Sequence, residues 1–245
     1  MEKTMDIRKI YGSVLTRMVD FQLRLQGETL IQAARGAHTA LVLDKDMTLT
    51  DNFSPRLNAL NRFLMQEGET LVLGPDTITQ CEGSLSRLID SMGADRERLL
   101  PFYSMVNDLD TRNEIYYPLI NPDIPQILDH ANANGFRPIA LATGNPQTTT
   151  VGQLRYLIKL PEAVFAFSRE FDGLQSFTGS SSALIYPWKH ILCNRLHELL
   201  GIPIVLVDDD RRQRSEINQA QSPHVRSIAP EWDRLLPILQ VGRSN

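Results

Sequence analysis

Residues 39–51 read Thr-Ala-Leu-Val-Leu-Asp-Lys-Asp-Met-Thr-Leu-Thr-Asp, a mostly apolar run that leads directly into acidic and hydroxyl side chains. A short, continuously apolar run is typical of a strand that is buried on both faces of a sheet. We therefore predict a strand at residues 39–43, with Asp44 as the first residue after it.

Similar apolar runs recur along the chain, at residues 138–142, 164–167, 204–207 and 225–228. Helical patterns lie between them at residues 148–160 and 188–200, and the second pattern stops at Gly201, with Pro203 just beyond. Alternation of strands and helices implies parallel strands joined by right-handed crossovers. The predicted fold class is α/β, with a Rossmann-like open parallel sheet and helices on both of its faces.

The segment between the first two strands is too long for a single crossover. Its patterns predict helices at residues 55–66, 77–92 and 95–106 and a strand at residues 70–73. We therefore predict a mostly α-helical cap at residues 54–121, inserted into an α/β core of residues 37–53 and 122–245.

The N-terminal segment, residues 1–36, carries apolar residues at the spacing of an amphipathic helix. We favour a helix that packs on the side of the core. The second hypothesis is a homodimer contact through this helix.

Bulk composition restricts the classes of partner. The 245 residues carry a net charge of −4, which argues against a nucleic-acid-binding surface, because such surfaces have a basic excess. No apolar run approaches the ~20 residues that a helix needs to cross a bilayer. The charged N-terminus has no apolar run behind it, which argues against a cleaved signal peptide. Cys81 and Cys193 lack metal-ligand spacing and suit reduced thiols. We expect a cytoplasmic protein with neither a membrane nor a nucleic-acid partner.

Polar side chains follow the predicted strands or begin the helix between them. These groups are Asp44 to Asp51, Thr143 with Gly144, Lys189, and Asp208-Asp209-Asp210. Because ligands of open parallel sheets bind at the carboxyl ends of the strands, we expect all four groups to meet at one edge of the sheet.

Such a gathering suits phosphoryl transfer. A carboxylate can attack phosphorus and form an acyl phosphate, which divides one difficult displacement into two easier ones. Several carboxylates close together repel one another, so the site needs a cation, and hard oxygen ligands suit Mg²⁺. A lysine ammonium and a hydroxyl can hold the phosphoryl oxygens, while a second carboxylate serves as general acid and base.

The same residues, in the same order, resemble the haloacid-dehalogenase superfamily. Its phosphatases carry Asp-x-Asp-x-Thr after the first strand, Thr or Ser after the second, Lys before the fourth, and an acidic pair or Gly-Asp after the fourth. The matches in this chain are Asp44, Asp46 and Thr48; Thr143; Lys189; and Asp208 with Asp209.

This resemblance implies a role for each match. Asp44 would be the nucleophile and Asp46 the general acid and base, while Thr143 and Lys189 would hold the phosphoryl group. Mg²⁺ would be bound by Asp44, by the backbone carbonyl of Asp46, and by Asp208 or Asp209.

Three features depart from the pattern of the superfamily. Lys45 stands where an apolar or aromatic residue is usual, and we favour a lysine that points to solvent or pairs with a carboxylate over one that contacts substrate or damps the nucleophile. Met47 stands where Gly is very common. The acidic run has Gln213 and Arg214 where a further Asp is usual, which leaves open which of its three aspartates binds metal.

The arginines after the acidic run have two interpretations. Arg211, Arg212 and Arg214 suit the solvated face of the next helix, and the alternative is a contact to an anionic substrate.

Together these features predict a phosphatase. Within the superfamily that the sequence resembles, Asp46 favours phosphate-ester hydrolysis or transfer over dehalogenation. The cap favours a small phosphorylated metabolite, because a closed lid excludes macromolecules. Two alternatives stay open. One is the same fold acting as a low-turnover binding or regulatory protein, and the other is a phosphatase for phosphoproteins or nucleic-acid ends.

Overall fold

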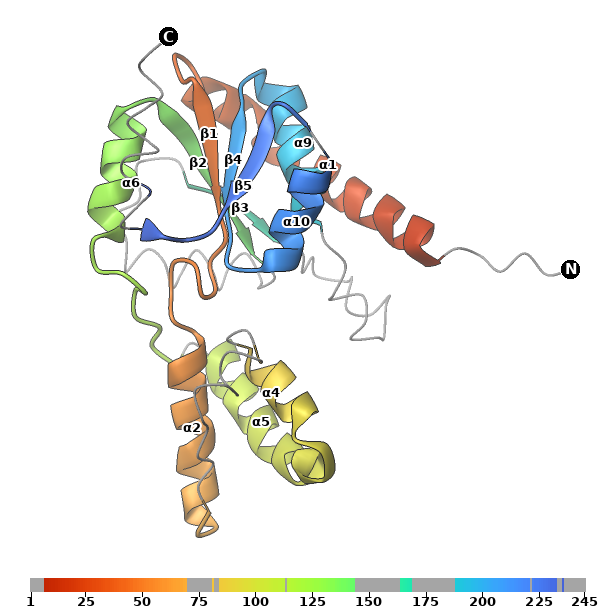
Figure 1. Cartoon of the computed structure of the whole chain (residues 1–245), viewed down its shortest axis with the longest axis vertical. Helices are drawn as coiled ribbons and strands as arrows, with labels where there is room; N and C mark the ends of the chain where they lie inside the picture. Colours follow the sequence, from red (N-terminus) through yellow and green to blue (C-terminus); the bar gives the residue numbers. More distant parts are fainter. Residues whose placement is uncertain are drawn as a thin grey trace, which may run out of the picture. The chain divides into compact units, whose positions relative to one another are not determined.

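The computed structural model describes residues 7–69, 81, 84–112, 114–143, 164–168, 188–220, 222–232 and 235 (Figure 1). The chain divides into two compact units, of which one comprises Met1–Thr48 with Asn121–Asn245 and the other Leu49–Ile120. The helix predicted at residues 148–160, the strand predicted at 70–73 and Gly144 lie outside the described residues.

A five-stranded parallel sheet forms the centre of the first unit. Its strands are β1 (Thr39–Leu43), β2 (Phe136–Thr143), β3 (Val164–Ser168), β4 (Ile204–Val207) and β5 (Val225–Ile228). They lie in the order β3-β2-β1-β4-β5, and every neighbouring pair is parallel. The predicted α/β fold is therefore confirmed.

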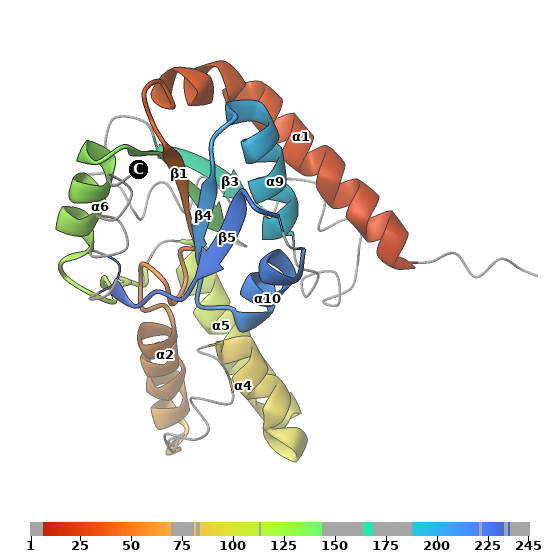
Figure 2. The ribbon, with the colours of Figure 1, turned by 45° about the horizontal axis from the view of Figure 1, so that its top comes forward.

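Helices lie on both faces of this sheet (Figure 1 and Figure 2). One face carries α6 (Ile124–Ala133), and the other carries α1 (Ile7–Ala33), α9 (Lys189–Leu200) and α10 (Arg211–Gln219). The sequence analysis did not predict α6, although its buried residues recur at helical spacing: Ile124, Ile127, Leu128 and Ala131. The end of α9 agrees with the predicted stop, since Gly201 adopts a left-handed conformation with φ of 68°.

The register of the three central strands brings their carboxyl ends to one edge. Leu43 of β1 pairs with Leu141 of β2 on one side and with Val207 of β4 on the other. The next residue, Asp44, donates its backbone N–H to Val207 O at 2.9 Å. Side chains that directly follow β1 and β4 are therefore held at the same level.

One face of α1 belongs to the core of this unit. Leu15, Val19 and Leu30 of α1 are buried in the same apolar cluster as Leu192 of α9 and Val42 of β1. The burial of this face explains the helical apolar spacing of the N-terminal segment. The homodimer hypothesis stays a prediction.

The second unit is helical where it is described. It contains α2 (Phe53–Gln66), α4 (Leu85–Ser91), the 3₁₀ turn η1 (Gly93–Asp95) and α5 (Arg96–Thr111). Its two chain ends lie together, because Thr50 and Leu119 form an antiparallel bridge and Ile120 donates its N–H to Leu49 O at 3.0 Å.

The helix predicted at residues 77–92 does not run through Ser84, and most of its predicted first part (residues 77–80, 82 and 83) lies outside the described residues. Ser84 is extended, and its Oγ accepts the N–H of Arg87, so it caps a helix that begins at Leu85. The helix predicted at 95–106 continues to Thr111, beyond the predicted end.

None of the helices in the described ranges is both long enough and apolar enough to span a membrane.

Candidate active site

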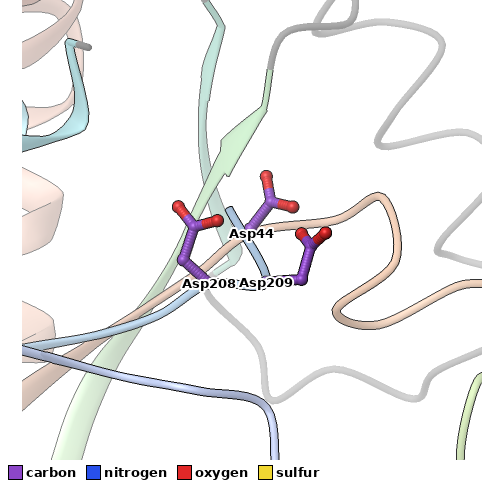
Figure 3. Close-up of side chains that lie close together, drawn as sticks. All are labelled: Asp44, Asp208 and Asp209. Carbon is purple, nitrogen blue, oxygen red and sulfur yellow. The ribbon is translucent and has the colours of Figure 1, made fainter. Parts of the chain in front are cut away.

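Three carboxylates gather where β1 and β4 end. Asp44 directly follows β1, and Asp208 and Asp209 follow β4; one carboxylate oxygen from each lies within 4.8 Å of the others (Figure 3). Asp44 and Asp208 are buried, Asp208 completely, whereas Asp209 is partly exposed. The edge of the parallel sheet therefore brings three carboxylates together, two of them away from water.

Lys189 lies inside this group of carboxylates. It is the first residue of α9, and its Nζ donates to Asp44 Oδ1 at 2.6 Å and to Asp208 Oδ2 at 2.7 Å. Sequence reasoning selected all four residues, and the fold brings them together.

The electrostatics of the cluster show an excess of negative charge. Burial raises the pKa of the Asp44 carboxyl well above its usual value; Lys189 opposes this rise, and the neighbouring aspartates add to it. Burial, followed by repulsion from Asp208, raises the pKa of Asp209 to about 6. For Lys189, burial alone would lower the pKa, but Asp44 and Asp208 outweigh it and raise the pKa above the usual value. One ammonium thus does not balance the charge of three neighbouring carboxylates, two of which are buried.

A divalent cation suits this excess. The three side chains offer carboxylate oxygens, which are the ligands that hard cations such as Mg²⁺ and Ca²⁺ prefer. Asp44, Asp208 and Asp209 could therefore hold a metal ion. Asp210 has a different role, because its Oδ1 accepts the N–H of Arg212 at 2.8 Å and caps α10.

Thr48 connects the loop after β1 to the loop after β4. Its Oγ1 accepts the backbone N–H of Asp209 at 3.0 Å and lies 3.3 Å from Asp209 Oδ1. The carbonyl oxygen of Thr48 accepts the indole N–H of Trp232 at 2.9 Å, and both residues are buried. The Asp-x-Asp-x-Thr motif pointed to Thr48, but no feature of the sequence pointed to Trp232.

Lys45 is buried, which corrects the prediction that it points to solvent. Its side chain is 1% exposed, and Nζ lies 3.3 Å from Oδ1 of Asp46, whose side chain is 29% exposed. The second part of the prediction, a pair with a neighbouring carboxylate, agrees with this contact. A lysine without a partner would be expensive to bury, so the acidic neighbour accounts for its place here.

Met47 adopts a positive φ of 59°, in the left-handed region. Residues with a Cβ are disfavoured there, and Gly is not. This explains why Gly is common at the corresponding position of the superfamily that the sequence resembles.

Thr143 is the last residue of β2 and is completely buried. Because β2 is the parallel neighbour of β1, Thr143 ends at the same edge of the sheet as Asp44.

The arginines after the acidic run divide into two kinds. Arg211 and Arg212 are exposed, in agreement with a solvated helix face. Arg214 is half-buried and donates Nη1 to the carbonyl oxygens of Asp208 at 2.5 Å and Asp209 at 2.6 Å. The prediction of a solvated face is therefore wrong for Arg214.

Comparison with models of protein families and with curated proteins found no match for the chain. Among solved structures, the chain is similar to a hydrolase from Streptococcus pneumoniae TIGR4, with 17% identity over 78% of this chain and 91% of that one and a TM-score of 0.49. It is also similar to a HAD family hydrolase from Deinococcus radiodurans R1, with 14% identity over 84% and 98% of the two chains and a TM-score of 0.46.

A third similar structure is a haloacid dehalogenase-like family hydrolase from Streptococcus pneumoniae, with 14% identity over 83% of this chain and 97% of that one and a TM-score of 0.44. The names of the second and third proteins are those of the superfamily that the sequence resembles. At these low identities and TM-scores, the function has to be inferred from the residues of this chain.

Proposed function

We propose that this protein is a Mg²⁺-dependent phosphatase of the haloacid-dehalogenase superfamily, which hydrolyses a small phosphate monoester through an aspartyl phosphate on Asp44. The observation that carries the proposal is the buried ammonium of Lys189, held between the carboxylates of Asp44 and Asp208 with Asp209 in the same cluster. An ion pair is costly to bury, and sites that perturb pKa values in this way are often catalytic.

In the first step of the proposed reaction, a carboxylate oxygen of Asp44 attacks phosphorus. A bond forms between this oxygen and phosphorus while the bond from phosphorus to the ester oxygen breaks, and Asp46 gives a proton to the departing alcohol. Lys189 opposes the rise in the pKa of Asp44 and so favours its ionised, nucleophilic form, and the Thr143 hydroxyl would donate a hydrogen bond to a phosphoryl oxygen.

In the second step, water attacks the phosphorus of the aspartyl phosphate. Asp46, now ionised, takes a proton from this water, and the bond between phosphorus and the Asp44 oxygen breaks. Inorganic phosphate leaves, and the carboxylate of Asp44 is restored. Asp46 thus serves as the acid in the first step and as the base in the second.

The donor set fits Mg²⁺. The carboxylates of Asp44, Asp208 and Asp209, with the backbone carbonyl of Asp46 that the resemblance implies, would hold the ion. When bound, the ion supplies positive charge that offsets the carboxylates and the phosphoryl oxygens.

The contact between Lys45 and Asp46 favours a second candidate, a low-turnover binding or regulatory protein. A carboxylate paired with a buried ammonium is less free to transfer a proton.

The inserted unit at Leu49–Ile120 supports a small phosphorylated metabolite as substrate, since an insert of this size suits a lid that excludes macromolecules.

One experiment separates the two candidates. Purified protein is offered p-nitrophenyl phosphate and a panel of phosphorylated metabolites, with Mg²⁺ and with EDTA, beside Asp44→Asn and a matched control, Asp129→Asn, at an exposed site on α6. We expect metal-dependent phosphate release from the wild type and from Asp129→Asn but not from Asp44→Asn. Release from the wild type that does not exceed that from Asp44→Asn would contradict the phosphatase proposal.

A further inference from the structure

Two adjacent residues of α10 contact the backbone of the cluster formed by Asp44, Asp208, Asp209 and Lys189. Gln213 and Arg214 occupy the positions where the superfamily that the sequence resembles usually has a further Asp. Both side chains make polar contacts with backbone atoms of Asp208, Asp209 or Lys189.

Arg214 holds the acidic segment through its backbone. One nitrogen, Nη1, donates to the carbonyl oxygens of both Asp208 and Asp209, at 2.5 and 2.6 Å. Two bonds to successive carbonyls fix the orientation of the peptide between these aspartates, and hence the direction in which their side chains leave the backbone. Arg214 is itself held by β5, because the Ser227 hydroxyl donates to Arg214 O at 3.0 Å.

Gln213 holds the helix that carries Lys189. The Lys189 N–H is in the first turn of α9, where backbone donors have no acceptor within the helix. The buried side chain of Gln213 supplies one, since its Oε1 accepts this N–H at 3.4 Å. The contact fixes the start of α9 and thereby the point from which the Lys189 side chain reaches Asp44.

The chemical types of these two residues suit the charge of the cluster. An Asp at either position would add a fourth carboxylate to a cluster of three, of which Asp44 and Asp208 already share the ammonium of Lys189. The neutral amide of Gln213 accepts the Lys189 N–H without adding charge, and the guanidinium of Arg214 donates to two carbonyls, which an ionised Asp cannot do, and offsets part of the repulsion.

We propose that Gln213 and Arg214 are positioning residues of the active site: Arg214 sets Asp208 and Asp209 for metal binding, and Gln213 sets Lys189 against Asp44. This inference rests on the proposed phosphatase function for its kinetic part, whereas its metal-binding part does not require turnover.

The metal-binding part is tested with the full-length chain and Mg²⁺ alone, by titration calorimetry without substrate. Arg214→Met should weaken Mg²⁺ binding by about tenfold or more, as is common when a residue that orients metal ligands is lost. Arg214→Lys should recover most of the affinity, because an ammonium can donate to both carbonyls. Arg211→Met is the matched control, since it removes the same charge from an exposed position of the same helix, and it should bind Mg²⁺ like the wild type.

The kinetic part is tested with Gln213→Leu, with p-nitrophenyl phosphate as the substrate. We expect kcat to fall by about tenfold while Mg²⁺ affinity stays unchanged, because Lys189 moves but the carboxylates do not. If Gln213 only stabilised the fold, Gln213→Leu would lower the melting temperature. It would then not lower kcat selectively while leaving the Mg²⁺ affinity unchanged.

Three results would overturn the inference. Arg214→Met could bind Mg²⁺ as tightly as the wild type, the loss could be equal in Arg211→Met, or Gln213→Leu could keep its kcat. If the wild type hydrolyses no phosphate ester, the proposed function and the role of Gln213 both fail, while calorimetry still decides the role of Arg214. If the wild type binds no Mg²⁺, the role of Arg214 fails as well.

Discussion

Lys189 and Asp44, which are 145 positions apart in the sequence, are joined by a buried hydrogen bond of 2.6 Å between Nζ and Oδ1. The same Nζ lies 2.7 Å from Asp208 Oδ2, so a single ammonium serves two carboxylates. Removing one member of such a group leaves uncompensated charge in the interior, and the effect on stability is therefore large.

Lys189→Met should lower the free energy of unfolding at pH 7 by about 3–5 kcal/mol in metal-free protein. The neighbouring carboxylates raise the pKa of Lys189, so its stabilising effect is complete at neutral pH and is lost only in strongly alkaline solution. Urea denaturation in EDTA measures the change. The double variant Lys189→Met/Asp208→Asn should recover part of the loss, and an unchanged stability in the single variant would show that the ion pair is not formed.

Asp209→Asn should stabilise the metal-free protein at pH 8 and leave it nearly unchanged at pH 4. The folded-state pKa of Asp209 is about 6, above the usual value, so its contribution to stability is present at low pH and is lost as the pH rises through about 6. The gain at pH 8 should be on the order of 2 kcal/mol. Urea denaturation in EDTA at the two pH values is the test, and a gain of equal size at both would contradict it.

Met47→Gly should keep or raise stability, by up to about 1 kcal/mol, because Gly adopts the left-handed conformation of this position without strain. Part of the gain is offset, since Gly increases the entropy of the unfolded chain. Met47→Val is the comparison variant. Its free energy of unfolding should fall by about 1 kcal/mol or more, because β-branched residues are strongly disfavoured at positive φ. Thermal melting of both variants ranks their stabilities against the wild type. A Val variant as stable as the Gly variant would exclude strain at this position.

Trp232→Phe should lower the free energy of unfolding by about 1–3 kcal/mol, because the buried carbonyl of Thr48 loses its indole donor. The change leaves Trp188, beside Lys189, as the sole tryptophan of the chain. Its fluorescence then follows both unfolding and Mg²⁺ titration. We expect weaker Mg²⁺ binding, since Thr48 also contacts Asp209, and an unchanged affinity would show that this contact survives without the indole.

Features that depend on neighbouring residues in the chain could be predicted well. A strand buried between parallel neighbours is apolar along most of its length. The short apolar runs of five and four residues were therefore enough to predict β1 and β4. Helix ends were less predictable, because they depend on caps and on packing. The Oγ of Ser84 begins α4 after the predicted start, and α5 continues to Thr111 although its apolar spacing suggested an earlier end.

The sequence by itself determined the parallel α/β fold and selected Asp44, Lys189, Asp208 and Asp209, since the alternation of strands and helices along the chain and the polar residues after each strand are local properties. Only the tertiary structure decided how these residues are held. The contact of Thr48 with Asp209 and that of Trp232 with Thr48 join residues 161 and 184 positions apart, and no periodicity encodes such pairs. The burial of Lys45 and the turn of Arg214 towards two carbonyls likewise depend on where charges meet after folding, because a buried ion is stable only beside its partner.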